Sequence, residues 1–162
     1  MIRHRPRLIA LHCAHEGFGY AVFDGRAIHD WGTVTARGDK NAMSLSKLGR
    51  LLDRFSPETL VLEEASEGAG RAARIVVLHK SIAALCRTRN IDLYQYALAD
   101  VRRCFDGVGA HTRQDIAEAV VRELDVLSPR LPRPRKAWQS EPRRMMIFSA
   151  AALALTHLDA RD

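Results

Sequence analysis

Two short apolar runs separated by a small glycine-containing segment constrain the fold of this chain more than any other feature. The first run is Leu8–Leu11, the second is Tyr20–Phe23, and the polar segment between them holds Gly17 and Gly19. This pattern predicts a buried strand, a tight turn and a returning strand. His12 directly follows the first run, so we expect it where the first strand ends and the turn begins.

Strand and helix signals alternate through the rest of the chain. Asp24-Gly25 is a strong hairpin signal, and strand formers fill 26–35, so the first three strands should form an antiparallel meander. The run at 59–62 closes on Glu63 and is apolar throughout, as expected of a parallel strand buried on both faces. A further strand is predicted at 91–96, with loops at 37–44 and 66–70.

Helical spacing fills the intervals between these strands. We expect helices at 45–55, from the 66–70 loop to about 89, at 98–105, from 112 to 124, and from near Pro142 to 158. The last of these helices is apolar almost all round, so we expect it to be buried. Thr112 and Asp115 have nearly the spacing of a capping box. The order predicts an α/β fold with a mixed sheet and helices on both faces.

Length and composition suit one domain. The chain has 162 residues, 47% of them hydrophobic, which is enough for a substantial core. We expect a basic tail at 1–7 and a single domain at 8–158. Cys13, Cys86 and Cys104 lie in apolar or helical patterns without zinc-type spacing, which indicates reduced core residues of a cytoplasmic protein. No leader-like or membrane-length apolar stretch is recognised, so a secreted or membrane-bound protein is not expected.

Positive charge is concentrated in two segments. The formal net charge is +6, but the tail and the Pro/Arg-rich loop at 128–144 together carry +8. A basic tail and loop on a nearly neutral body are typical of nucleic-acid binding, and a solvated tail and linker is the alternative. Trp138 lies inside this loop, where it either stacks on a base or pins the loop onto the body.

The order of these elements, together with five stretches of sequence, resembles the RuvC-type Holliday-junction resolvases. The stretches are Leu8–Phe23, Val61–Ala65, Val101–Arg103, Gly107–Arg113 and Ser149–His157. The resemblance spans nearly the whole chain, with a longer loop before the last helix than is usual in that family. It implies an RNase H-like mixed five-stranded sheet, branched or duplex DNA as the partner, and a homodimer.

The family's chemistry requires acidic residues at four places. One ends the first strand, one ends the fourth, and two acidic or histidine positions lie three apart on the last helix. They hold two Mg²⁺ ions, which bind the attacking and leaving oxygens of phosphodiester hydrolysis. This chain has His12, Glu63, Met146 and Ser149 there, so only Glu63 keeps its role and the site looks vestigial. No metal or cofactor is expected. If the protein is active, Glu63 and His12 would hold Mg²⁺ or Mn²⁺.

The family's basic residues are better kept than its acidic ones. The resemblance places Arg102 and Arg113 where the family contacts the DNA backbone, and arginine can bind phosphate through two parallel hydrogen bonds. The alternative is that they are ordinary exposed helix charges. The expected nucleic-acid-binding residues are Arg102, Arg103, Arg113, Arg133, Arg135, Lys136, Arg143 and Arg144.

Three functions follow from these patterns. The favoured one is a nucleic-acid-binding protein that is inactive as a two-metal nuclease. The second is a divergent structure-specific endodeoxyribonuclease with an altered metal site, to which Glu141 could separately add a carboxylate by swinging toward the cleft. The third is a protein-interaction scaffold that retains only the fold. The missing carboxylates argue against the second function, and the retained arginines argue against the third.

Overall fold

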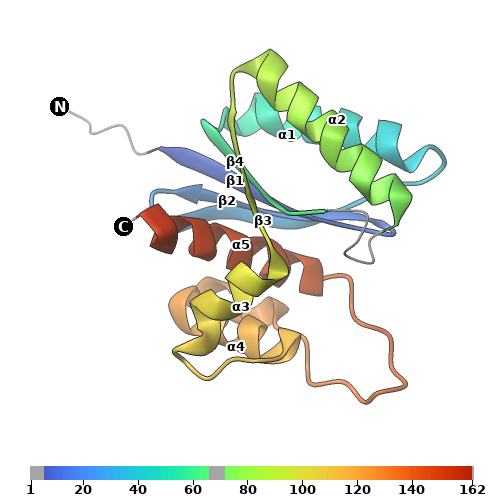
Figure 1. Cartoon of the computed structure of the whole chain (residues 1–162). Helices are drawn as coiled ribbons and strands as arrows, with labels where there is room; N and C mark the ends of the chain where they lie inside the picture. The colour runs from blue at the N-terminus through green and yellow to red at the C-terminus, as the bar shows by residue number, and fades with distance from the viewer. Residues whose placement is uncertain (1–5, 66–71, 162) are drawn as a thin grey trace.

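A five-stranded mixed sheet forms the centre of the molecule (Figure 1). The computed structural model describes residues 6–65 and 72–161. Along the sheet the strand order is β3-β2-β1-β4-β5. The strands are β1 (Arg7–Ala14), β2 (Gly17–Asp24), β3 (Ala27–Thr35), β4 (Thr59–Glu63) and β5 (Asp92–Tyr96).

Strand directions match the expected fold class. β1, β2 and β3 pair antiparallel as a meander, whereas β1, β4 and β5 pair parallel. The meander is continuous because short turns join its strands, and the parallel part needs helical crossovers. The prediction of an antiparallel meander joined to parallel strands is confirmed.

Helices cover both faces of the sheet (Figure 1). One face carries α1 (Lys40–Phe55) and α2 (Ala73–Arg89). The other carries α3 (Leu98–Asp106), α4 (Arg113–Glu123) and α5 (Met145–Arg161), with the 3₁₀ helix η2 (Asp125–Arg130) after α4. Nearly every residue of α5 from Met145 to His157 is buried, which confirms the expectation from its apolar sequence.

Several element boundaries differ from the sequence predictions, and α5, expected up to 158, ends at Arg161. The turn between β1 and β2 consists of His15 and Glu16, so Gly19 lies inside β2 and His12 lies inside β1 rather than at its end. Helix α1 begins at Lys40, within the segment predicted to be a loop. Its start is stabilised because the Asp39 carboxylate accepts a 3.1 Å hydrogen bond from the backbone N–H of Ala42, an N-cap that the polar composition obscured.

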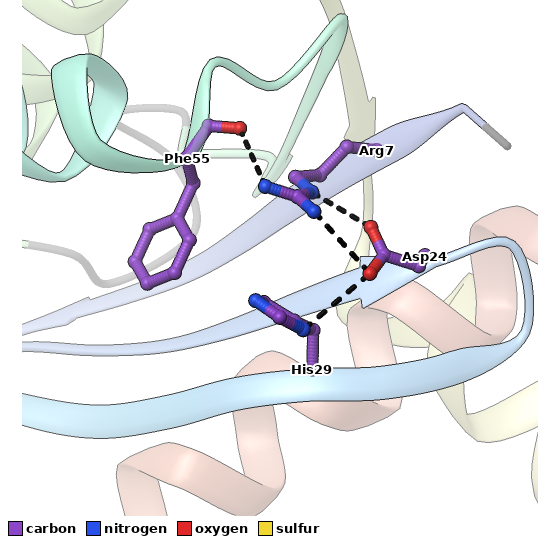
Figure 2. Close-up of polar contacts among 4 residues, drawn as sticks. All are labelled: Arg7, Asp24, His29 and Phe55. Atoms are coloured by element: carbon purple, nitrogen blue, oxygen red, sulfur yellow. Dashed lines mark hydrogen bonds and ion pairs between the residues drawn. The ribbon is translucent and has the colours of Figure 1, made fainter. Parts of the chain in front are cut away.

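Arg7, expected in the basic tail, is the first residue of β1 and joins three strands to α1 (Figure 2). Its Nε donates to Asp24 Oδ1 at 2.7 Å, and its Nη1 donates to the backbone carbonyl of Phe55 at 3.1 Å. His29 Nδ1 lies 3.4 Å from Asp24 Oδ2. Arg7 therefore contributes to the body of the fold, and the other residues of the predicted tail, apart from Pro6, lie outside the described part.

Several smaller expectations can also be compared with the structure. Thr112 and Asp115 form the predicted capping box at the start of α4. Cys13 and Cys86 are buried, Cys104 is half-buried, and all three are free thiols. The predicted 66–70 loop lies outside the described residues. Within 6–65 and 72–161, no helix has the length and apolar character needed to cross a membrane.

Candidate nucleic-acid interface

A small cavity lies where the carboxyl-terminal ends of β1 and β4 face α3, α4 and α5. Its volume is about 70 Å³, enough for a few water molecules. Its polar lining comes from three separate parts of the chain, namely the sheet, the two short helices α3 and α4, and α5. The polar residues that line it are His12, Glu63, Arg102, Arg113 and Ser149.

The two sheet residues of the cavity come from neighbouring parallel strands. Leu11 of β1 pairs with Leu62 of β4, so His12 and Glu63 follow at the same level. Side chains alternate along a strand, and both residues therefore share the face that α5 covers. His12 Nδ1 lies 3.8 Å from Glu63 Oε2, and both side chains are buried. The structure thus brings these two predicted residues into contact distance.

Helix α5 brings only one of its two predicted residues to the cavity. Ser149 lines it together with Met145, Phe148 and Ala152, which form one stripe along the helix. Met146 is turned away from that stripe and packs on β2. A Cβ at Gly19 would lie 2.5 Å from the Cβ and the carbonyl oxygen of Met146. Because glycine has no side chain, α5 can approach β2 this closely at that point.

The donor set at this cavity does not fit a pair of Mg²⁺ ions. Among the described residues that line it, Glu63 supplies the one carboxylate, accompanied by the His12 imidazole and the Ser149 hydroxyl. Glu64 is exposed and absent from the lining. Within the described chain, no group of three or more His, Cys, Asp or Glu side chains is placed to hold a metal ion. Two Mg²⁺ ions need several hard oxygen ligands, which this lining does not supply.

Two of the predicted basic residues line the cavity from opposite helices. Arg102 comes from α3 and Arg113 from the first turn of α4, and both are exposed. Arg103 lies beside Arg102 in sequence but is directed elsewhere, because its Nη2 donates to Asp100 at 3.0 Å. The described lining of the cavity therefore has two guanidiniums at its mouth and one buried carboxylate below them.

The basic loop, predicted at 128–144, begins only at residue 131, because η2 extends to Arg130; defined as residues 131–144, it adjoins this mouth. Glu141 Oε1 accepts a 2.6 Å hydrogen bond from Arg113 Nη1, and its Oε2 lies 3.8 Å from Arg135 Nη2. A groove of about 410 Å³ runs between the loop and the start of α4 and shares Arg113 and Met145 with the cavity. Glu141 lines this groove and not the cavity, so it adds no carboxylate beside Glu63.

The remaining predicted cations have different surroundings. Arg143 Nε lies 3.5 Å from Glu16 Oε2, and its guanidinium donates to the Thr35 hydroxyl, so it fastens the end of the loop to the meander. Three others are exposed to solvent: Arg133, Lys136 and Arg144.

Sequence reasoning missed three residues that shape this region. It did not identify Gly19 as the contact point of α5, and it did not pair Glu141 with Arg113. It also missed Arg74, whose Nη2 donates to the carbonyl of Ala14 at 3.1 Å and so supports the β1–β2 turn. A glycine between two aromatic residues in an apolar strand was the available signal for the first of these.

Comparisons with known proteins give a likeness of structure without a detectable likeness of sequence. No family model and no curated protein matches the chain. The structure of Thermus thermophilus RuvC is similar with a TM-score of 0.69 and 18% identity, over 96% of this chain and 95% of that chain. The chain has a RuvC-like fold. The same bacterial protein in complex with Holliday junction substrate matches at a TM-score of 0.69 and 16% identity, over the same shares of both chains.

A viral protein has the same fold with less similarity. The fowlpox virus Holliday junction resolvase matches at a TM-score of 0.58 and 11% identity, over 95% of this chain and 99% of that chain. The resemblance read from the five sequence stretches is thus confirmed at the level of fold. Identities this low carry no information about individual site residues. On this RuvC-like fold, the roles assigned to His12, Glu63, Met146 and Ser149 remain predictions.

Proposed function

We propose that this protein binds nucleic acid, with branched or duplex DNA as the expected class, and does not hydrolyse it by a two-metal mechanism. The observation that carries the proposal is the composition of the cavity. Arg102 and Arg113 stand at its mouth, whereas the described lining below them contains Glu63 as its one carboxylate, with His12 against it. The two guanidiniums at the mouth attract a phosphate, whereas the described lining below them supplies too few oxygen ligands for two metal ions.

Phosphate contact is the role we assign to the exposed cations around the mouth. The two guanidiniums project from different helices, so they suit two phosphates of a backbone that crosses the cavity. The likeness to a RuvC structure that contains Holliday junction substrate supports DNA as the ligand. At Arg113, phosphate has to displace the Glu141 carboxylate, which makes binding an exchange of one anion for another.

Hydrolysis is disfavoured by charge and by ligand number. In two-metal hydrolysis the ions stabilise the charge that develops on the attacking and leaving oxygens, and this electrostatic contribution supplies much of the rate. A single carboxylate does not hold two divalent ions in that geometry. With His12 3.8 Å from Glu63, the one acidic group is already accompanied by a nitrogen base.

Binding and cleavage are best measured on the same samples. A labelled four-way junction and a matched duplex are titrated with protein in EDTA, Mg²⁺ and Mn²⁺, and the bound DNA is then analysed for nicks. We expect binding without cleavage. Cleavage that disappears on Glu63→Gln would favour the divergent nuclease, and absence of binding to any nucleic acid would favour the scaffold.

The contribution of the cavity arginines is tested by charge-matched variants. The double variant Arg102→Ala/Arg113→Ala should lower affinity and reduce the slope of log affinity against log salt by about 0.9 for each phosphate that the protein no longer neutralises. The control Lys80→Ala/Arg87→Ala removes the same charge from exposed positions of α2, on the opposite face of the sheet. Equal decreases of affinity in both double variants would mean that net charge alone drives binding.

We infer a homodimer from the resemblance to the resolvases, and a cytoplasmic location from the reduced cysteines. Size-exclusion chromatography with light scattering tests the dimer, because one chain has a mass of 18.1 kDa and a dimer has twice that mass. A single species at the mass of one chain, at concentrations above those used for binding, would contradict it.

A further inference from the structure

Trp138 is the most exposed of the large hydrophobic side chains in the described chain, at 78%. Of its two sequence interpretations, the one in which it pins the basic loop to the body is therefore wrong, because an indole that packed on the body would be covered. Exposure of so large an apolar ring is unfavourable in the free protein, and covering it would bury a large apolar area. Covering of the ring by a partner would therefore lower the free energy of the complex.

The turn that carries Trp138 has a defined shape. Gln139 N–H donates to the Lys136 carbonyl at 2.9 Å, which closes a tight turn with Trp138 at its third position. The Gln139 side-chain oxygen accepts from the Lys136 N–H at 2.9 Å, and Arg135 Nη1 donates to the Gln139 carbonyl at 2.7 Å. The indole is thus displayed on a preorganised turn, which reduces the entropy cost of using it in binding.

Both ends of the basic loop are fixed close to the cavity, while its middle projects away from the body (Figure 1). At the start, Gln114 Nε2 donates to the carbonyl of the buried Pro132 at 2.9 Å. At the end, Glu141 contacts Arg113. Residues 133–140 between these anchors are all exposed. The indole therefore lies on an arm that begins and ends beside the phosphate-binding arginines.

The charges around the ring identify the chemistry of its partner. No acidic residue occurs in the sequence between Asp125 and Glu141. Lys136 Nζ lies 5.2 Å from the centre of the Trp138 ring, a cation–π contact that holds a positive charge against the indole. A flat aromatic surface next to concentrated positive charge suits a flat aromatic ligand that carries negative charge, which describes a nucleotide within a strand.

We propose that Trp138 stacks on an unpaired base of a bound nucleic acid, while the adjoining phosphates lie along the groove at Arg113, Arg135 and Lys136. The proposal rests on the proposed function and adds a preference to it. A base inside a continuous duplex is already stacked on both sides, so the indole selects a base at a gap, a single-stranded segment or a strand exchange.

Affinity for paired and unpaired DNA tests this preference. Two duplexes with the same paired sequence are compared by fluorescence anisotropy. One is continuous, and the other has a short gap in one strand that leaves thymidines of the opposite strand unpaired. The ends of both are closed by non-nucleotide linkers. Trp138→Ala should weaken binding to the gapped duplex about ten-fold, which is about 1.4 kcal/mol, and leave the continuous duplex unchanged, because only the unpaired base loses a stacking partner. Trp138→Phe, which keeps a stacking ring, should retain most of the affinity.

The control Val77→Ala removes an exposed apolar side chain from α2, on the other face of the sheet, and should change neither affinity. Equal decreases of affinity for both duplexes in Trp138→Ala, or no decrease for either, would overturn the stacking proposal while leaving the proposed function in place. Wild-type protein that binds neither duplex would overturn the stacking proposal, and the proposed function would fail as well if the four-way junction is also left unbound.

Fluorescence gives a second and direct readout. The chain has two tryptophans, and Trp31 is half-buried on β3. A thymidine homopolymer should quench the emission of wild-type protein, because a stacked base is in contact with the indole of Trp138. In Trp138→Phe only Trp31 emits, and the quenching should disappear. Quenching that persists in this variant would overturn the proposal.

Discussion

The Glu141 carboxylate lies against the Arg113 guanidinium, with 2.6 Å between Oε1 and Nη1. The two residues are far apart in sequence, and their contact joins the basic loop to the start of α4. Arg113 also lines the cavity, so the carboxylate occupies a guanidinium to which we assign phosphate binding. Arg135, 3.8 Å from the other oxygen, adds a second cation to the same carboxylate. Glu141 thus stands where a phosphate would have to enter.

Glu141→Gln should therefore increase the affinity for nucleic acid. The neutral amide no longer competes with phosphate for Arg113, and a partly exposed ion pair of this kind contributes about 0.2–1 kcal/mol, which predicts a gain of about 1.4- to five-fold. Anisotropy titrations at several salt concentrations measure it. Glu123→Gln, at the exposed end of α4, makes the same charge change away from the loop. Equal gains in both variants would contradict a local competition.

Gly19→Ala should destabilise the fold, because α5 passes over this residue without room for a side chain. The added methyl group would lie 2.5 Å from two atoms of Met146, one of them a backbone oxygen. Overpacking of this kind costs about 1–3 kcal/mol of unfolding free energy, measurable by urea denaturation. Gly107→Ala is the control, because a methyl group there meets nothing within 4 Å. Equal stabilities of the two variants would show that α5 can move away from β2 at little cost.

The stability of the protein should fall as the pH decreases below about 6.5, through His157. Burial, followed by the Arg161 charge, lowers the pKa of this imidazole below its ordinary value of 6.5. Its Nδ1 lies 2.8 Å from the Tyr96 hydroxyl. Between the two pKa values the unfolded chain binds a proton that the folded chain does not, so protonation favours unfolding. Above pH 6.5 this contribution is fully present.

Urea denaturation at pH values from 7.5 to about 5 measures this dependence. His157→Gln should reduce the decrease of stability below pH 6.5, even if the variant is less stable at every pH. An unchanged pH dependence would assign the decrease to other groups.

Local patterns in the sequence were sufficient for most of the fold. The apolar runs predicted the meander, the unalternated run before Glu63 predicted a parallel strand, and the apolar last helix predicted its own burial. Each of these follows from periodicity, which is a property of neighbouring residues. The proximity of His12 and Glu63 also follows from two adjacent parallel strands, although β1 continues to Ala14 and His12 is not its last residue.

The parts that the sequence did not predict depend on contacts between distant segments. Whether Met145 or Met146 faces the cavity is decided by the rotation of α5, which is set where that helix crosses Gly19. Arg7 looked like part of a basic tail because its partners, Asp24 and Phe55, are brought to it only by the folded sheet and α1. No spacing rule connects such residues.

The last prediction concerns the cavity floor. Wild-type protein should leave junction DNA intact in Mg²⁺ or Mn²⁺, and Mn²⁺ should not raise its melting temperature. In the double variant His12→Asp/Ser149→Asp, two carboxylates join Glu63 around the cavity, at positions that both line it. Three buried carboxylates repel one another, so the variant should be less stable without metal. Met146→Asp is left out because that residue packs on Gly19.

A bound divalent ion relieves this repulsion and stabilises only the folded state, so added Mn²⁺ should raise the melting temperature of the double variant. Glu63→Gln, added as a third change, should abolish that rise, because it removes a ligand and keeps the shape of the side chain. The melting temperature reports metal binding whether or not hydrolysis returns. The result therefore tests the metal ligands of the cavity and does not require DNA binding or cleavage. An equal rise in wild-type protein, or wild-type cleavage that Glu63→Gln removes, would contradict the inactive floor and make His12 the first residue to test as a metal ligand.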